Sequence, residues 1–277
     1  MPAAESPAAT SNTPAPFVLR EDADAVATLT LNRPESLNAL SDGMLDALQE
    51  TLDAIAGDES VRAVILRGAG RAFCAGHNLK DMRANYIIDY QRALFARCSK
   101  MMLTVHRLPQ PVLAQVHGLA TAAGCQLVAA CDLAVAAADA RFATSGINVG
   151  LFCSTPGVAL GRNVARKHAM EMLLTGDFVD AERAQEIGLV NRVALAGNLD
   201  AATRELAATL TAKSAYALTL GKQAFYRQLE MPLTGAYEYA AEEMARNMMD
   251  RDAAEGVDAF IAKRPPSWDQ SRREDDG

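Results

Sequence analysis

The chain has 277 residues, of which 50% are hydrophobic and 22% are charged, so it can bury a large core in one domain or in one domain with a small appendage. Its 34 acidic residues outnumber its 27 Lys and Arg residues, which gives a net charge of −7. This balance argues against nucleic acid and anionic membrane surfaces as main partners, because both require a basic face. No apolar run approaches the roughly 18 residues that a membrane span requires.

The cysteines and the first residues bear on the cell compartment. Five cysteines at irregular spacing, with no C-x-x-C pair, favour free thiols in a reducing compartment. Residues 1–15 lack the cationic start and apolar stretch of a secretory signal, and they lack the arginine richness of a mitochondrial transit peptide. We therefore expect a cytoplasmic protein with a disordered tail over residues 1–15.

Strands and helices are expected to alternate from Phe17 onward. An apolar run, an acidic turn at Asp22–Asp24 and an alternation of Thr with Leu over 28–31 predict a β-hairpin. Alternation of strand and helix is typical of βαβ units, which place ligands at the carboxyl ends of parallel strands. The elements that follow the hairpin are a helix capped by Ser41 and ended by Gly57, a strand over 61–66, a loop over 68–76, a helix over 89–108, a strand over 112–116, a glycine turn over 118–124 that opens a helix, and a strand over 133–136.

Beyond Gly176 the pattern becomes helical. The change predicts an α/β core over 16–200, a helical region over 201–268 and a frayed tail over 269–277. The Met-rich segment 242–249 favours packing against a neighbour over cofactor binding. Helices are predicted over 181–187, 199–210, 216–229, 236–249 and 252–262.

Several common chemistries lack their signatures in this chain. There is no G-x-x-x-x-G-K-[ST], G-x-G-x-x-G, G-x-S-x-G or H-E-x-x-H motif. The four histidines do not cluster with carboxylates at metal-ligand spacing. We expect neither a metal site nor a hydrolase triad.

Two glycine-containing segments, 73–80 and 117–126, each follow a strand end and precede a helix. Turns of this kind present free backbone N–H groups, with the positive end of a helix dipole behind them. Two N–H donors that converge on one oxygen form an oxyanion hole, whereas glycines that only permit tight turns have no chemical role. Spacing alone leaves both interpretations open and favours the structural one.

Four groups of motifs decide between these interpretations. In their order and spacing, over about residues 17–264, they resemble the crotonase (enoyl-CoA hydratase/isomerase) superfamily. The resemblance implies an α/β fold with a spiral ββα core, a C-terminal helical trimerisation region, and a homotrimer or a dimer of trimers. It also implies an acyl-CoA thioester substrate and no dissociable cofactor, since coenzyme A is part of the substrate. The motifs are Asn32-Arg-Pro-x-x-x-Asn38-Ala-Leu40, Ala72-Phe-Cys-Ala-Gly76-x-x-Leu-Lys80, Val116-x-Gly118-x-Ala-x-x-x-Gly124-Cys125, and Met172-Leu-Leu-Thr-Gly-Asp177 with Ala184-x-x-x-Gly188-Leu-Val190.

Carried over to this chain, the resemblance assigns an oxyanion hole to the backbone N–H groups of His77 and Ala123. Two amides would stabilise the negative charge that addition, proton abstraction or decarboxylation builds on a thioester oxygen. We expect Ala123→Pro to delete one amide and to keep the fold. Arg33 and Lys80 are candidates for the CoA phosphates, against the alternative that each is an ordinary surface cation. The substrate-binding positions implied are Arg33, Ala39, Leu40, Ala75, Asn78, Leu79, Lys80, Gly124 and Ser154.

The resemblance breaks where hydratases of this family carry two catalytic glutamates. Gln126 stands at the first position and Gly146 at the second; an amide cannot take a proton near neutral pH, and glycine supplies no side chain. The turn over 150–157 is also longer than in those hydratases. These departures resemble the subgroup named enoyl-CoA hydratase domain-containing protein 3, which lacks both glutamates. We expect Glu at both positions to raise hydratase activity if only the carboxylates are absent.

Three functions stay open at this point. The first is an acyl-CoA enzyme of the enoyl-CoA hydratase type, a lyase or isomerase of fatty acid metabolism that stabilises a thioester enolate. The second is chemistry without the glutamates, such as decarboxylation of a malonyl-type CoA thioester. The third is a non-catalytic acyl-CoA-binding protein. The His77 side chain is a candidate proton carrier or a residue that closes the site.

Overall fold

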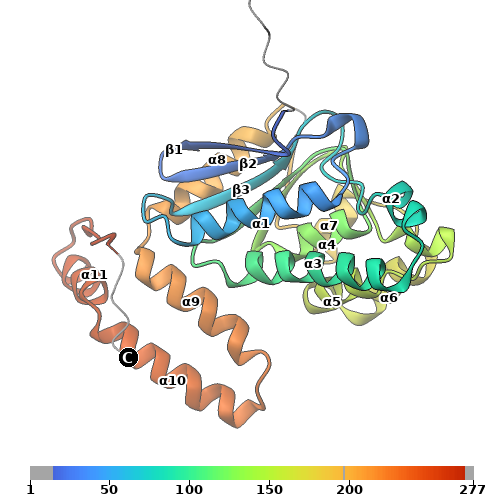
Figure 1. Cartoon of the computed structure of the whole chain (residues 1–277). Coiled ribbons are helices and arrows are strands. Elements are labelled where there is room, and N and C mark those ends of the chain that lie inside the picture. Colours follow the sequence, from blue (N-terminus) through green and yellow to red (C-terminus); the bar gives the residue numbers. More distant parts are fainter. Residues whose placement is uncertain (1–14, 196, 272–277) are drawn as a thin grey trace, which may run out of the picture.

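The computed structural model describes residues 15–195 and 197–271. The expected disordered tail over 1–15 therefore lies outside the described residues except for its last position. Figure 1 shows an α/β body from which α9 (Ala215–Gln228) and α10 (Leu233–Met249) extend side by side, with α11 (Arg251–Ile261) at the end of the pair where α9 begins and α10 ends. In the described ranges, no helix has the length and apolar character needed to cross a membrane.

The main sheet has six strands in the order β1-β2-β3-β4-β6-β9. β1 and β2 form the predicted antiparallel hairpin, and every other neighbouring pair is parallel. All six residues of β2 are buried, so its threonines lie inside as well as its leucines. The strands are β1 (Val18–Ala23), β2 (Val26–Leu31), β3 (Ala63–Gly68), β4 (Val112–Val116), β6 (Leu133–Ala137) and β9 (Arg192–Ala194).

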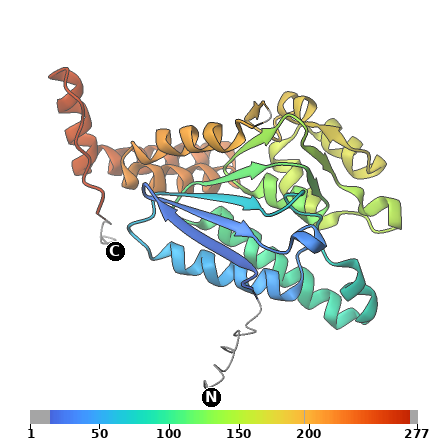
Figure 2. The ribbon, with the colours of Figure 1, turned by 90° about the horizontal axis from the view of Figure 1, so that it is seen from above.

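Helices cover both faces of this sheet. Helix α8 (Leu199–Thr211) packs on one face, where Ile65 and Leu113 join its apolar side chains. Helices α1 (Asp42–Ala56) and α3 (Ile88–Arg107) pack together on the other face, which contains Leu66 and Ala114. Because successive strand residues point to opposite faces, one strand supplies both layers of the core. Figure 2 shows the strands between these two helical layers.

A second, smaller sheet adjoins the two glycine-containing segments, 73–80 and 117–126. It consists of β5 (Leu119–Thr121), β7 (Arg141–Ala143) and β8 (Val179–Asp180), with β5 and β7 parallel. Strand β5 interrupts the predicted glycine turn over 118–124, and helix α4 (Ala123–Ala130) follows it. Three helices were not predicted as elements from the sequence pattern, namely α2 (Leu79–Ala84), α5 (Ser154–Asn163) and α6 (Arg166–Thr175). The predicted helix over 181–187 is present as α7 (Ala181–Glu186). Two short 3₁₀ turns are η1 (Pro34–Ser36) and η2 (Ser145–Val149).

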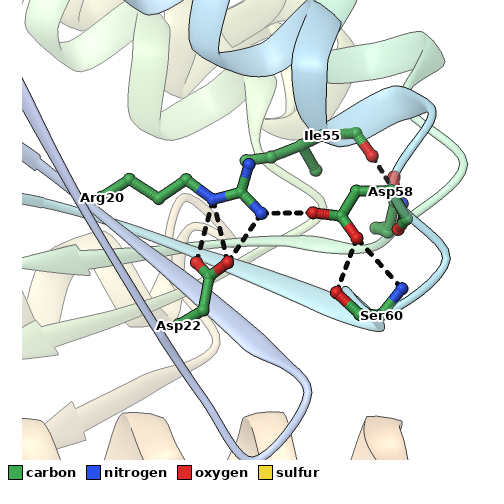
Figure 3. Close-up of polar contacts among 6 residues, drawn as sticks. Arg20, Asp22, Ile55, Asp58 and Ser60 are labelled. Carbon is green, nitrogen blue, oxygen red and sulfur yellow. Dashed lines mark hydrogen bonds and ion pairs between the residues drawn. The ribbon is translucent and has the colours of Figure 1, made fainter.

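Arg20 ties the edge hairpin to the turn that follows α1 (Figure 3). Its guanidinium donates to Asp22 at 2.7–3.0 Å and to Asp58 at 2.5 Å, while Asp58 accepts from the backbone N–H and the hydroxyl of Ser60. The bonds from Ser60 and Arg20 lower the pKa of Asp58. These bonds join β1 to a segment 38 residues away and close the exposed edge of the sheet.

A buried ion pair fixes α9 to the core. The Nζ of Lys222 lies 2.7 Å from Oδ2 of Asp132 and donates to the carbonyls of Val105 and Gln110. The hydroxyl of Tyr226 donates to the other carboxylate oxygen at 2.8 Å. Asp132 lies two residues after the end of α4 (Ala123–Ala130), so this contact connects α9 to the end of a helix that carries a predicted site residue.

The last described residues are held rather than frayed. The backbone N–H of Asp269 donates to the buried carboxylate of Asp252 at 2.7 Å, and the side chain of Gln270 accepts from Ala215 at 3.1 Å. Our prediction of a frayed tail over 269–277 is therefore wrong for residues 269–271, because polar groups of α9 and α11 bind this segment. Residues 272–277 lie outside the described residues.

Candidate active site

The two glycine-containing segments meet at Gly76 and Ala123. The backbone N–H of Thr121 donates to the carbonyl of Cys74 at 3.0 Å, and that of Cys74 donates to the carbonyl of Leu119 at 3.1 Å. The Thr121 hydroxyl donates to the carbonyl of Ala75 at 3.0 Å. Gly76 has φ +87°, and a Cβ at this position would lie 2.9 Å from the oxygen of Thr121 and 3.1 Å from the nitrogen of Ala123. Only glycine permits both this backbone conformation and this approach.

Two backbone amides at this junction have no hydrogen-bond partner among the described residues. Ala122 precedes α4 with φ 50° and ψ −117°, a conformation that costs a non-glycine residue free energy, and its own N–H donates to Ala143. Throughout the described part of the chain, no hydrogen bond from the backbone N–H of His77 or of Ala123 is present. The structure thus brings two unengaged donors onto adjoining segments, one of them at the first residue of a buried helix.

The Ala122 conformation overturns our expectation for Ala123→Pro. A proline restricts the residue before it to extended backbone with negative φ, whereas Ala122 has positive φ. The substitution would therefore distort the junction as well as delete the amide, and it cannot isolate the amide's role.

The His77 side chain packs inside the site. Its Nδ1 lies 3.3 Å from the carbonyl oxygen of Leu40, and its ring meets the Phe95 ring edge to face, with centroids 5.6 Å apart. Burial lowers the pKa of His77, and the Leu40 carbonyl and Asp42 oppose this shift. The imidazole is therefore neutral at pH 7. Nε2 is buried and has no partner among the described residues.

The positions of the absent glutamates differ in how they are filled. Gln126 lies on α4, is 5% exposed, and has a buried Oε1 without a partner in the described ranges. A Cβ on Gly146 would lie 2.4 Å from the oxygen of Leu151 and 2.8 Å from the sulfur of Cys153. The longer turn thus occupies the space beside Gly146, so the condition on which we expect Glu at both positions to raise hydratase activity, that only the carboxylates are absent, is not met there.

Cys153 and Ser154 belong to that turn. Cys153 is buried, and burial raises the pKa of its thiol, so it stays protonated at neutral pH. Ser154 is exposed at the start of α5, and its hydroxyl lies 3.4 Å from the carbonyl of Phe152. All five cysteines are buried and unpaired, as the irregular spacing predicted.

The segment that contains Ala39 and Leu40 runs beside the junction. Leu40 N donates to the Gly76 carbonyl at 2.8 Å, and Ala75 N donates to the Leu37 carbonyl at 3.0 Å. A Cβ on Gly124 would lie 2.1 Å from the Cys74 oxygen, so glycine is needed for the contact of α4 with this loop. The structure therefore brings these predicted positions together.

The two predicted phosphate-binding cations have different surroundings. Arg33 stacks on Phe17 at 3.7 Å and donates to the carbonyls of Ala15, Pro16 and Asn32, so its guanidinium is engaged within the chain. Its availability for a phosphate is thereby reduced.

Lys80 is exposed near the start of α2, where Asn78 accepts from the Lys80 backbone N–H at 3.0 Å and caps the helix. The neighbouring Leu79 is 54% exposed. The three residues therefore form an open rim rather than a closed pocket.

Asn38 is a positioning residue that the sequence motifs did not single out as a site residue. It is fully buried, and its amide nitrogen donates to the carbonyls of Ala69, Ala72 and Phe73. Its φ of +54° belongs to the left-handed region, which asparagine tolerates. The Asn32–Leu40 motif contained this residue, but the pattern alone gave no sign of which loop its side chain holds.

Comparison with known proteins establishes the class to which this fold belongs. The enoyl-CoA hydratase/isomerase family model matches residues 21–272, so this chain belongs to that family, the crotonase superfamily. A solved enoyl-CoA hydratase from Mycobacterium smegmatis is 57% identical, with a TM-score of 0.90, over 92% of this chain and 99% of that one. The predicted fold class is confirmed.

Within the family, the chain is similar to proteins named enoyl-CoA hydratase domain-containing protein 3. The Xenopus laevis protein is 46% identical over 256 residues, which cover 92% of this chain and 87% of the relative. The solved human protein is 42% identical with a TM-score of 0.88, over 91% of this chain and all of that one. The predicted subgroup is confirmed.

The names of these relatives correct one expectation. The Xenopus laevis protein and four other vertebrate proteins with the same name are called mitochondrial. Our expectation of a cytoplasmic protein is contradicted by these names. It rested on the residues of the N-terminal segment, of which the structure describes only residue 15.

Proposed function

We propose that this protein binds an acyl-CoA thioester and stabilises an enolate-like charge on the thioester oxygen through the backbone N–H groups of His77 and Ala123. The observation that carries the proposal is the pair of unpartnered amides on segments that touch at Gly76 and Ala123. Donors fixed in place before the charge develops need no reorganisation, which is why such pairs stabilise oxyanions strongly.

The strain at Ala122 supports this role. Its conformation is held by a bond to Ala143 and by the contact of Gly76 with the Ala122 side chain. Strained backbone of this kind persists where the surroundings enforce it, and it is concentrated at functional sites. The first amide nitrogen of α4 adjoins the neighbouring loop, since a Cβ on Gly76 would lie 3.1 Å from it.

The test deletes one N–H without changing shape. Replacing Ala123 by lactic acid, through nonsense suppression, converts the amide into an ester and leaves the side chain and the backbone angles as they are. The probe is an aryl-enoyl CoA thioester, whose absorbance moves to longer wavelength when donors polarise its carbonyl. We expect the shift in the natural protein and its loss in the ester variant, with turnover of any confirmed substrate falling by about 10²–10³.

Ala181 provides a matched control. It is also a buried alanine at the first position of a helix, α7, and it lies outside the site. The ester at Ala181 should keep the spectral shift. An unchanged shift in the Ala123 ester would refute the oxyanion hole.

Assays on the natural protein distinguish the functions that remain open. Loss of enoyl-thioester absorbance with crotonyl-CoA reports hydration, and release of carbon dioxide from malonyl-type thioesters reports decarboxylation. Binding with neither reaction would leave the acyl-CoA-binding function. The proposal needs no dissociable cofactor, because coenzyme A arrives with the substrate.

We also propose that the helical region over 201–268 forms a homotrimer, alone or in pairs of trimers. Supporting this, Met244, Met249 and Phe260 on α10 and α11 are 77%, 85% and 84% exposed in the single chain. Exposed apolar side chains in such number on one region mark an interface. Light scattering should give three or six times the chain mass, and Met244→Asp should lower it.

A further inference from the structure

The direction of the His77 N–H is set by the other end of its own peptide group. The carbonyl of Gly76 belongs to that group, and it accepts a hydrogen bond from Leu40 N at 2.8 Å. The peptide is trans and planar, so its C=O and N–H point in opposite directions. The N–H of His77 therefore points away from Leu40, out of the contact between the two segments.

The N–H of Ala123 is oriented by the same rule. The carbonyl of Ala122, in the same peptide group, accepts from Gln126 N at 3.0 Å within the first turn of α4. The N–H of Ala123 therefore points out of the start of the helix. The helix itself supplies this bond, whereas the corresponding bond at Gly76 depends on a segment 37 residues before His77.

The side chain of His77 returns to that same segment. Its Nδ1 lies 3.3 Å from the carbonyl oxygen of Leu40, whose N–H is the donor to Gly76. A carbonyl only accepts, so Nδ1 carries the ring proton in this bond. Leu40 and His77 form a parallel β-bridge, and both main-chain groups of Leu40 are engaged by two successive residues of the site loop.

The groups that this bond joins are themselves fixed. The Leu40 side chain is fully buried, and the next residue, Ser41, caps α1. The imidazole is half-buried and meets the ring of Phe95 edge to face at 5.6 Å. A bond between groups that are already ordered costs little further conformational entropy. The imidazole is therefore a rigid link between the site loop and Leu40.

The same surroundings make the ring a poor proton carrier. Burial lowers the pKa of His77, so the ring is neutral at pH 7. A histidine that takes up a proton is usually stabilised by a carboxylate bonded to its other nitrogen. Within the described part of the chain, Nδ1 meets a carbonyl instead and Nε2 has no partner.

We propose that the imidazole of His77 is a positioning residue, which holds Leu40 against Gly76 and thereby fixes the direction of the His77 N–H, and that it transfers no proton. This inference rests on the proposed function, because the fixed N–H is one of the two oxyanion donors. It replaces both roles that the sequence leaves open for this side chain.

Three substitutions of His77 separate these roles. Asparagine places an amide nitrogen where Nδ1 lies and does not titrate, and leucine has the shape of asparagine without a donor. Glutamine extends its amide nitrogen to the place of Nε2. Because Nε2 has no partner among the described residues, its removal breaks no bond within the chain.

The main readout is the absorbance shift of the aryl-enoyl CoA thioester. We expect His77→Asn to keep most of the shift, and His77→Leu and His77→Gln to lose a large part of it. For any confirmed substrate, kcat should fall about 10- to 100-fold in the last two variants with KM nearly unchanged, since a misplaced donor acts on the transition state. A role in folding alone would lower Tm without separating asparagine from leucine in the spectrum.

His168→Leu is the matched control, because His168 is also half-buried and lies on α6, outside the site. It should leave the shift unchanged. A proton carrier would give the opposite pattern, with the full shift in all three His77 variants and turnover lost in His77→Asn, and this result would overturn the inference. Equal loss of the shift in His77→Asn and His77→Leu would also overturn it.

Two further results are distinguishable from these. If His77→Leu does not fold, the comparison of His77→Asn with His77→Gln decides in the same way. Failure of the proposed function appears already in the natural protein, as the absence of any spectral shift with the aryl-enoyl probe, and the inference then fails with it.

Discussion

At Gly146 the neighbouring turn leaves no space for a side chain. A Cβ there would lie 2.4 Å from the Leu151 oxygen, so the turn must move by at least 0.6 Å to reach the 3.0 Å that real Cβ atoms keep. The turn from Gly146 to Leu151 is closed by a hydrogen bond from Leu151 N to the Gly146 carbonyl at 3.0 Å. Gly146→Ala therefore tests whether the turn fills the place of the second glutamate.

The expected loss of stability combines two effects. Overpacking costs about 1–3 kcal/mol, and loss of the Leu151 bond costs about 0.5–1.5 kcal/mol. Together they lower the free energy of unfolding by about 1.5–4.5 kcal/mol, which at about 2–4 °C per kcal/mol corresponds to a fall in Tm of about 3–18 °C. Thermal unfolding followed by circular dichroism measures the change.

Gly161→Ala is the control for Gly146→Ala. Gly161 lies in α5 with no atom within 4 Å of its added Cβ, so alanine there should raise the stability by about 0.5–1 kcal/mol through helix propensity. An unchanged Tm for Gly146→Ala would show that the turn is loose and that our steric reasoning is wrong.

The same geometry sets the outcome of restoring both carboxylates. Gln126→Glu with Gly146→Glu should give no gain in hydration of crotonyl-CoA, because the second side chain cannot enter the site without displacing Leu151 and Cys153. A stable double variant with strong hydratase activity would refute this account and would return the chain to ordinary hydratase chemistry with two carboxylates missing.

Three further predictions concern stability. Lys222→Met leaves Asp132 buried without its cation and should cost about 3–5 kcal/mol in urea unfolding. The pKa of His77 is lower in the folded chain than in the unfolded chain, so the unfolded chain binds more protons at a pH below the ordinary histidine pKa of about 6.5. The free energy of unfolding should therefore fall as the pH drops below this value. The fall should be smaller in His77→Phe. Arg20→Met should cost up to about 1 kcal/mol by the same unfolding assay, whereas Arg92→Met, at an exposed pair, should cost nothing measurable.

Much of the framework could be predicted from the sequence because it depends on local patterns. Apolar spacing and end signals located α1, α3 and the helices beyond Gly176 to within a few residues. The acidic turn and the Thr–Leu alternation located the hairpin. Short elements escaped: β5 has three residues and α2 has six, too few to show a period.

The site could be predicted only as far as its backbone. Glycine positions indicate where segments approach, and family motifs pointed to His77 and Ala123. The partners of side chains depend on residues far away in the sequence. Arg33 is engaged by carbonyls 17 and 18 residues earlier, and nothing in the Asn32–Leu40 motif shows that. The steric limit at Gly146 likewise requires the path of the 151–153 backbone.

The two glutamate positions have therefore not changed in the same way. At Gly146 a backbone turn has closed the space, so carboxylate chemistry has no room there. At Gln126 an uncharged amide stands in place of the carboxylate, and its buried Oε1 has no partner among the described residues. Loss of function alone would not preserve a strained Ala122, two unpartnered amides and an unpartnered acceptor in one place, because each lowers stability when no ligand is bound. A bound ligand that accepts from the amides would offset part of this cost, so a direct measurement of acyl-CoA binding is informative even if the protein hydrates no substrate.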